Sequence, residues 1–158
     1  MQKITPFLWF NDNAEEAMNL YCSIFKDTRI NSLVRYGKVG PGAEGSVMTA
    51  SFQLFGQTFT ALNGGPRFKF TEAISFVVQC DTQEEVDEYW DKLIAGGGQA
   101  SMCGWLKDKF GLSWQIIPKA LMELMGDKDP EKAKRVMEAM LKMSKIDVKI
   151  LREAYNKK

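Results

Sequence analysis

A repeated order of residue types constrains the fold of this chain more than any other feature. Residues 7–21 place a short apolar run before a helical segment that begins with two glutamates, and residues 76–90 repeat that order. A second matched pair joins residues 55–62 to residues 110–117. Each half therefore predicts a strand, a helix and then several strands. We expect a duplicated module, in which matched positions show what each half could contribute to a shared site.

The periodicity and the helix start signals give more detailed expectations. One helical stripe is formed by Ala14, Ala17, Met18, Tyr21 and Phe25. Asn13 and Thr82 are predicted helix N-caps, because each has a glutamate three residues later in a capping-box pattern. Further helices are expected near residues 121–125, from Pro130 onward and over residues 147–155. Strands are expected at residues 4–10, 30–36, 47–54, 58–62, 74–80, 100–106 and 113–117.

Composition excludes several classes of partner. The chain has 158 residues, with 21 basic and 20 acidic side chains and a net charge of +1, so it has no long-range attraction for nucleic acid or anionic lipid. No apolar run is long enough to span a membrane, and the first residues do not resemble a secretory signal. Cys22, Cys80 and Cys103 are widely spaced and are interpreted as reduced thiols of a cytoplasmic protein.

The sequence contains no histidine. This removes the commonest general base, the commonest zinc and iron ligand, and every nucleophile that depends on an imidazole. The paired glutamates do not replace it, because their place at helix starts already explains them through capping and the helix dipole.

Four segments carry a resemblance to a known family: residues 6–10 (PFLWF), 61–66 (ALNGGP), 104–108 (GWLKD) and 113–116 (SWQI). Together they resemble the PhnB-like branch of the vicinal oxygen chelate superfamily, which includes glyoxalases, bleomycin resistance proteins and extradiol dioxygenases. Proteins of this branch often carry the label 3-demethylubiquinone-9 3-methyltransferase.

The resemblance implies an α+β fold with two tandem βαβββ modules that form a cupped eight-stranded sheet, followed by C-terminal helices. It also implies a homodimer. We expect one domain, with module one at about 1–66, module two at about 67–118 and a C-terminal extension at about 119–158.

In metal-using members of the superfamily, four ligands come from matched places in the two modules. The matching positions here are Pro6, Thr60, Ser75 and Gln115. Proline has no donor side chain, and neutral hydroxyl and amide groups are poor ligands for a transition metal. We therefore expect no metal and no other cofactor, and a polar floor that suits an uncharged or hydrogen-bonding ligand.

The methyltransferase label finds no support in the residues. A cofactor site of that kind places a glycine-rich turn between a strand and a helix start. Residues 96–98 (GGG) follow a helix and end it, whereas Gly64 and Gly65 are followed by Pro66 and a segment that does not open a helix.

Other candidate ligand contacts are Asn63, at the start of a tight turn, and Arg67, in a segment that alternates cations and aromatic rings. For both, a solvated turn with its rings in the core is the simpler interpretation. Trp105 is the aromatic residue most expected to line a pocket, although most such rings belong to the core.

We expect a protein that binds a small organic molecule in the cupped sheet without a metal. One alternative is an enzyme of lyase, isomerase, dioxygenase or methyltransferase type acting on a small metabolite, for which Asp108 is the nearest carboxylate, although a turn role suits it better. Another is a dimeric interaction module whose contact surface is the methionine-rich tail. Packing of that tail against the chain's own sheet is the simpler interpretation.

Overall fold

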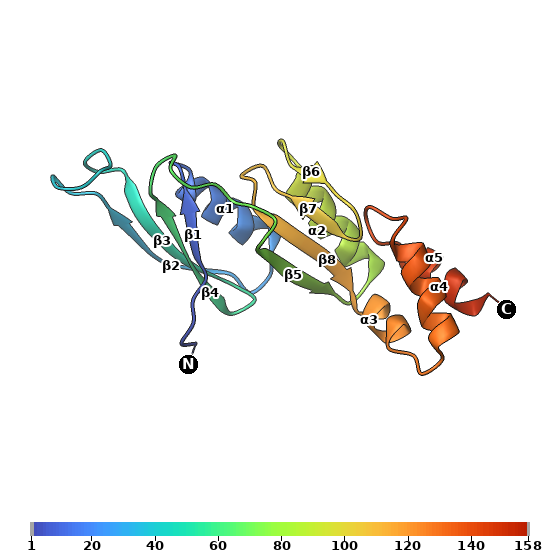
Figure 1. Cartoon of the computed structure of the whole chain (residues 1–158). Helices are drawn as coiled ribbons and strands as arrows, with labels where there is room; N and C mark the ends of the chain where they lie inside the picture. Colours follow the sequence, from blue (N-terminus) through green and yellow to red (C-terminus); the bar gives the residue numbers. More distant parts are fainter. Residues whose placement is uncertain (1, 158) are drawn as a thin grey trace. The chain divides into compact units, whose positions relative to one another are not determined.

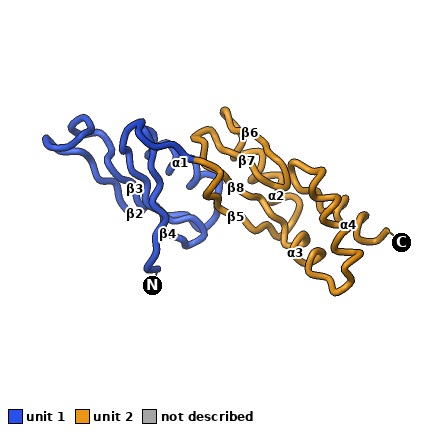
Figure 2. The backbone as a smooth tube through the Cα atoms, in the orientation of Figure 1, with its two compact units in different colours: residues 1–70 blue, residues 71–158 orange. Residues whose placement is uncertain are grey.

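The computed structural model describes residues 2–157 and divides into two compact units, Met1–Phe70 and Thr71–Lys158 (Figure 2). Each unit contains a four-stranded mixed sheet. The expectation of two tandem strand–helix–strands modules is therefore confirmed, and the fold is α+β. The closing of the strands into one eight-stranded cup, and the single domain, stay predictions.

The first unit begins with β1 (Phe7–Phe10) and α1 (Ala14–Ile24), followed by β2 (Arg29–Arg35), β3 (Val47–Leu54) and β4 (Gln57–Asn63) (Figure 1). The strand order is β1-β4-β3-β2, with β1 parallel to β4 and the other pairs antiparallel. The predicted strand at residues 4–10 is shorter than expected, because residues 4–6 precede the ladder and Ile4 is 86% exposed.

Helix α1 packs on one face of this sheet with the predicted apolar stripe. Ala14, Ala17, Met18 and Tyr21 are all buried, and the Tyr21 ring lies 6.3 Å from that of Phe52 on β3. Full burial of a large apolar side chain such as that of Met18 stabilises the fold by about 1.5–3 kcal/mol relative to exposure. The helix thereby closes one face of the sheet and leaves the other face open.

Asn13 is the N-cap of α1, as predicted, but the expected side-chain bond is absent. The Ala14 N–H instead donates to Oδ1 of Asn63, at the end of β4, at 2.8 Å. A side chain that is distant in sequence therefore satisfies a free N–H of the first turn.

The second unit contains β5 (Ser75–Cys80), α2 (Gln83–Ile94), β6 (Gln99–Ala100), β7 (Trp105–Lys107) and β8 (Ser113–Pro118). Its strand order, β5-β8-β7-β6, matches that of the first unit, and β5 is parallel to β8. The predicted N-cap of α2 is confirmed, because Oγ1 of Thr82 accepts from the Glu85 N–H at 3.2 Å. The Glu85 carboxylate in turn accepts from the N–H of Asp81, one residue before the cap, at 2.9 Å.

One predicted strand is wrong. Residues 100–106 do not form a continuous strand, because a turn interrupts them between β6 and β7. Cys103 and Gly104 both have positive φ, at 58° and 83°, and the Trp105 N–H donates to the Met102 carbonyl at 3.1 Å. The left-handed pair reverses the chain and ends the strand.

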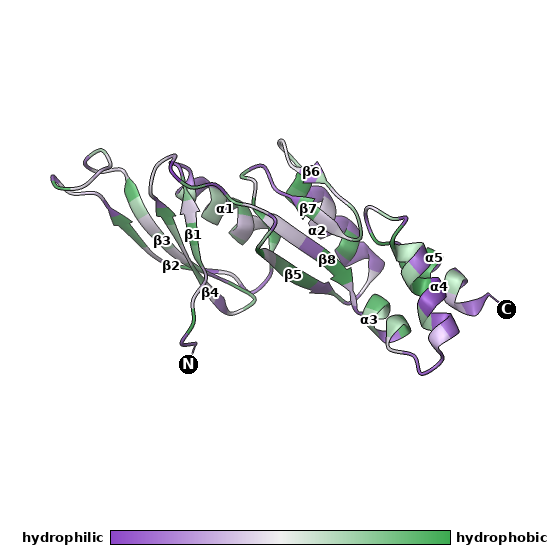
Figure 3. Cartoon of the chain, viewed as in Figure 1, coloured by the Kyte–Doolittle hydropathy of each residue, from purple (hydrophilic) through white to green (hydrophobic). Residues whose placement is uncertain are grey.

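After β8 come α3 (Lys119–Met125), α4 (Pro130–Met140) and α5 (Val148–Asn156), as predicted. Asp129 and Asp147 cap α4 and α5. These helices carry hydrophobic and hydrophilic residues side by side (Figure 3). They enclose a small core of their own, formed by Leu121, Val136, Met143, Ile146 and Leu151. We call residues 119–157 the extension. No helix within residues 2–157 has the length and hydropathy of a membrane span.

Candidate functional site

Each sheet has one face that its helix does not cover, and most of the sequence-predicted site residues lie on these open faces. Side chains alternate along a strand, so the buried Leu106, Trp114 and Ile116 face α2, whereas Trp105 and Gln115 face away from it. Thr60, Ser75, Trp105 and Gln115 all belong to such open faces by the same alternation.

The open face of the second unit brings three predicted residues together. Nε2 of Gln115 donates a hydrogen bond to Oγ of Ser75 at 2.8 Å, between the parallel strands β5 and β8. Trp105 is the direct antiparallel partner of Gln115. Facing residues of that kind have Cβ atoms about 4.5–5.5 Å apart, so the half-buried indole lies beside the amide. Val77 flanks Gln115 on the other side and is 53% exposed.

Sequence reasoning missed a further member of this polar cluster. Ser113 pairs with Ser75 and shares the face of Gln115, two residues away. It is only 1% exposed, and its hydroxyl has no hydrogen-bond partner among the described residues. Leaving a buried hydroxyl unpaired costs about 1–3 kcal/mol. Ser113 and Gln115 alternate with apolar residues along β8, and this pattern is the sequence signal that could have identified Ser113.

One ion pair borders the polar cluster. Lys107, the β7 partner of Ser113, binds Glu72. The hydrogen bond from Lys107 lowers the pKa of Glu72. A carboxylate held in this way is a weak general base at neutral pH, so it gives little support to acid–base catalysis at this face.

Thr60 has the matching place in the first unit. It lies on β4 between Phe7 of β1 and Ser51 of β3, and its N–H donates to the Pro6 carbonyl at 3.0 Å. On the same face, Gln53 Nε2 donates to Oγ1 of Thr58 at 3.3 Å. The first unit therefore has its own glutamine–hydroxyl pair, although at a different position along the strands.

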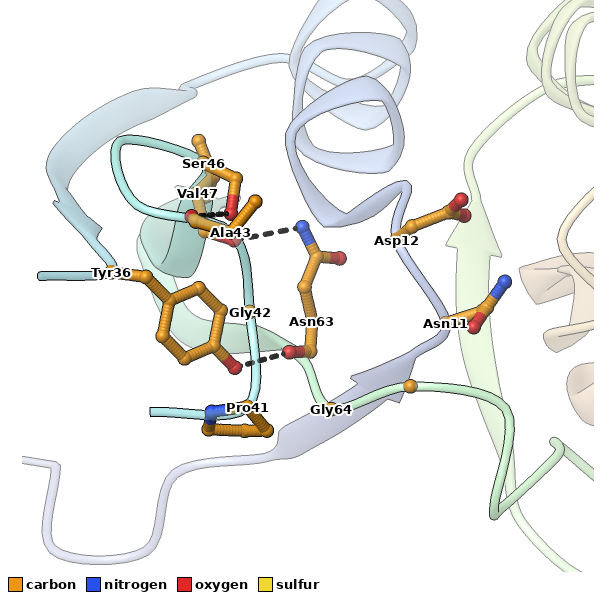
Figure 4. A pocket seen from close by; sticks show the side chains of 11 residues that line it. Asn11, Asp12, Tyr36, Pro41, Gly42, Ala43, Ser46, Val47, Asn63 and Gly64 are labelled. Atoms are coloured by element: carbon orange, nitrogen blue, oxygen red, sulfur yellow. Dashed lines mark hydrogen bonds between the residues drawn. The ribbon is translucent and has the colours of Figure 1, made fainter. Parts of the chain in front are cut away.

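The first unit also has a cavity of about 330 Å³, near the lower end of the range for ligand pockets. Figure 4 shows Tyr36 and Asn63 joined by a hydrogen bond at its wall, with Asn11 and Asp12 directed away from Tyr36. The loop after Tyr36 approaches the ring so closely that a Cβ on Gly42 would lie 2.2 Å from two ring atoms. The lining residues are Asn11, Asp12, Tyr36, Pro41, Gly42, Ala43, Ser46, Val47, Asn63, Gly64 and Gly65.

Asn63 lines this cavity, but its polar groups are engaged within the protein. Its Oδ1 accepts from the Ala14 N–H, its Nδ2 donates to the Val47 carbonyl at 3.0 Å, and its own carbonyl accepts from the Tyr36 hydroxyl at 2.7 Å. It joins β4 to β3, to α1 and to the Tyr36 loop. This structural role accounts for an asparagine here without a ligand.

Arg67 lies in an exposed loop, with its guanidinium 5.2 Å from the Phe68 ring centre. Phe68 and Phe70 make edge contacts with Trp9 and Phe10 of β1. Both rings therefore pack on the first unit, although Phe68 remains 54% exposed. Arg67 does not share a unit with Ser75, Trp105 and Gln115.

Asp108 has the turn role. It is 3% exposed, its Oδ1 accepts from the Phe110 and Leu112 N–H groups at 2.9 and 3.0 Å, and its Oδ2 accepts from Nε1 of Trp114 at 2.9 Å. The carboxylate fixes the loop between β7 and β8, and Trp114 is one of the residues that face α2.

The residues at the four matched positions do not fit a metal ion. Pro6 offers only a carbonyl that Thr60 already uses, and Ser75 and Gln115 bind each other. Within residues 2–157, no three side chains of His, Cys, Asp or Glu gather closely enough to hold one. Hydroxyl and amide groups alone are a weak ligand set for zinc, iron or nickel.

Two tandem modules with this strand order give the chain the fold of glyoxalase/bleomycin resistance proteins. The structure is similar to a glyoxalase/bleomycin resistance protein from Albidiferax ferrireducens, with 14% identity over 73% of this chain and 96% of that one (TM-score 0.50). It is also similar to the fosfomycin resistance protein FosX of Listeria monocytogenes, with 17% identity over 78% and 97% of the two chains (TM-score 0.52). At these identities the likeness concerns the fold alone.

Within that class, the chain belongs to the 3-demethylubiquinone-9 3-methyltransferase family, which matches residues 2–117. The PhnB protein of Bacillus cereus, described by the same methyltransferase name, is 43% identical over 74% of this chain and 99% of its own (TM-score 0.68). No curated protein matches the chain. The PhnB-like resemblance inferred from four short segments is therefore confirmed.

Proposed function

We propose that the protein binds a small organic molecule on the open face of the β5–β8 sheet, without a metal ion. The observation that carries the proposal is the Ser75–Gln115 hydrogen bond beside the half-buried ring of Trp105. A few placed polar groups next to an aromatic surface are typical of sites for small molecules.

The groups present select the chemistry of the ligand. Gln115 uses one amide N–H on Ser75, which leaves a second N–H and its carbonyl oxygen for a ligand. Trp105 and Val77 flank this amide and offer an apolar surface on either side. A flat, uncharged molecule with one donor and one acceptor, such as an aromatic amide, suits this arrangement.

Benzamide is a suitable probe, with benzylamine and benzoate as charged controls of the same size. We expect benzamide to shift the amide resonances of β5, β7 and β8 in NMR titration. Gln115→Leu keeps the size of the side chain and removes its hydrogen bonds, so its benzamide affinity should fall about tenfold. Gln53→Leu is the matched control, because it disrupts the glutamine–hydroxyl pair of the first unit and should leave the affinity unchanged.

Equal affinity of wild type and Gln115→Leu, or preferred binding of benzoate or benzylamine, would contradict the proposal. The metal-free part has its own test, which is elemental analysis of protein purified without chelator. Stoichiometric zinc, nickel, manganese or iron that disappears in Gln115→Leu would reject it.

We also propose that the protein is a cytoplasmic homodimer. Three free cysteines, Cys22, Cys80 and Cys103, agree with a reducing compartment. Light scattering after gel filtration measures the mass in solution. A monomer across the micromolar range would contradict the dimer.

A further inference from the structure

The turn that precedes Trp105 depends on residues far away in sequence. Cys103 and Gly104 both adopt left-handed backbone conformations, which for a non-glycine residue such as Cys103 is unfavourable. The N–H groups of both residues donate to the extension, to the Met143 and Ser144 carbonyls, each at 2.8 Å. The Ser144 hydroxyl also donates to the Ser101 carbonyl, on the other arm of the turn.

The segment that holds the turn is itself fixed to α2. The Gln83 side chain spans it, since Nε2 donates to the Ile146 carbonyl at 3.0 Å and Oε1 accepts from the Val148 N–H at 2.9 Å. Lys145 pairs with Asp87 at 2.9 Å, one helical turn further along α2. Residues 143–148 thus connect α2 to the tip of the β6–β7 hairpin.

Apolar contacts close the same junction. A Cβ on Gly104 would lie 3.0 Å from Cδ1 of Ile117 and 3.1 Å from Cγ1 of Ile146, so glycine allows β8 and the extension to meet here. Ile117 packs against the core of the extension. It lies two residues after Gln115 and on the same face of β8, so the extension borders the open face directly beside the polar cluster.

The contacts between residues 101–104 and the extension lie where the family match ends, at residue 117. The family matches residues 2–117, and the PhnB protein of Bacillus cereus uses 99% of its own length to cover 74% of this chain. The carbonyls of Met143 and Ser144 therefore come from a part of the chain that lies outside the shared fold. What holds the Trp105 turn is specific to chains that carry such an extension.

We propose that the extension is a positioning element of the ligand site. By holding residues 101–104, it fixes the ring of Trp105 beside Gln115, and by covering Ile117 it limits the length of ligand that this face accepts. The inference rests on the proposed function for the identity of the ligand. The effect of the extension on the position of the Trp105 ring does not depend on any ligand.

The test uses the full chain labelled with fluorotryptophan and observed by fluorine NMR. Gln83→Ala removes both hydrogen bonds that anchor residues 143–148, and the Gln83→Ala, Lys145→Ala double variant also removes the ion pair. We expect the Trp105 resonance to shift and broaden. The Trp90 and Trp114 resonances, from the same unit, should stay in place.

Gln83→Glu retains an acceptor for the Val148 N–H but cannot donate to Ile146, so its Trp105 signal should lie between those of wild type and Gln83→Ala. Benzamide affinity should fall about fivefold in the double variant, as expected when a ring contact is no longer held in place.

An unchanged Trp105 resonance in the double variant would overturn the proposal. Equal shifts of Trp90, Trp105 and Trp114 would also overturn it, because they would report general loosening of the unit. If benzamide fails to bind the wild type while Trp105 alone responds to Gln83→Ala, the proposed ligand is wrong and the positioning role of the extension stands.

Discussion

Replacing Asp108 by asparagine tests the most heavily hydrogen-bonded side chain of the β7–β8 loop. The substitution keeps the shape of the side chain but turns one carboxylate oxygen into an NH₂ group. The least damaging orientation keeps an oxygen toward the Phe110 and Leu112 N–H groups and places the NH₂ against Nε1 of Trp114. Two donors then face each other in a buried site, because Asp108 is only 3% exposed.

The loss can be worked out from these contacts. A hydrogen bond to a charged group contributes about 1.5–3 kcal/mol, so loss of the Trp114 bond costs about that much. The two remaining bonds become neutral and weaken by roughly half, while removal of a buried charge offsets part of the loss. We expect Asp108→Asn to lower the free energy of unfolding of the second unit by about 2–4 kcal/mol.

Urea unfolding followed by tryptophan fluorescence and circular dichroism measures this change. With a typical slope, the midpoint should fall by roughly 1–2 M urea. Asp91→Asn is the matched control, because Asp91 is an exposed carboxylate of α2 and its loss should change stability by less than about 0.5 kcal/mol. A change for Asp108→Asn no larger than that of the control would refute the reasoning.

Three further predictions concern other parts of the chain. Gly64→Ala should destabilise the first unit by about 1–3 kcal/mol and alter Trp9 fluorescence, because the new Cβ would lie 2.3 Å from a Trp9 ring atom. Burial, with acidic neighbours, raises the pKa of Cys80 to about 12, so a chromogenic disulfide reagent at about pH 8 should modify this thiol only after unfolding. The hydrogen bond from Lys145 lowers the pKa of Asp87, so this pair stabilises the fold above the unfolded carboxyl's pKa and loses that effect as pH falls through the lower folded value. The protection factors of the amides of residues 143–148, which correct for the slower intrinsic exchange in acid, should therefore fall below about pH 4.

Each of these has a clear contrary outcome. An unaltered Trp9 signal in Gly64→Ala would show that the close approach is not required. Labelling of Cys80 in the native protein at the rate of a free thiol would contradict its burial. An equal acid-induced loss of protection of residues 143–148 in a Lys145→Ala variant would show that the Asp87 pair is not the cause.

The sequence predicted the parts of the fold that depend on local pattern. The helix stripe of Ala14, Ala17, Met18 and Tyr21 is buried as expected, and residues 47–54 form a strand with the predicted bounds. Such features follow from periodicity within one segment. The same strand order in both units also follows from the repeat, because matched patterns fold into matched topologies.

The predictions that failed concern segments whose structure depends on residues distant in the sequence. The strand expected at residues 100–106 breaks because Cys103 adopts a left-handed conformation, which the extension stabilises from far along the chain. Helix α1 begins after Asn13, as predicted, but the side chain that satisfies its first N–H is that of Asn63, for the same kind of reason. In both places a partner that is distant in sequence decides the local structure, and no window of neighbouring residues contains that information.

The candidate site shows the same division. Matching the two halves was enough to predict Ser75 and Gln115 on one face, and the structure joins them by a hydrogen bond. Ser113 was missed because it looks like one more small residue of a strand, and its buried hydroxyl becomes significant only in three dimensions. Asn63 and Arg67 were predicted from turn composition, which does not distinguish a ligand contact from a side chain that contacts other parts of the protein.

No linker separates the shared fold from the extension. Strand β8 ends at Pro118 and α3 begins at Lys119, so the first helix continues from the strand that carries Gln115 without a flexible joint (Figure 1). A force on the last three helices is therefore transmitted directly to β8. A fluorophore, a surface or a partner molecule attached to those helices would perturb the sheet. These helices are therefore a poor place for an inert tag and a good place for a sensor.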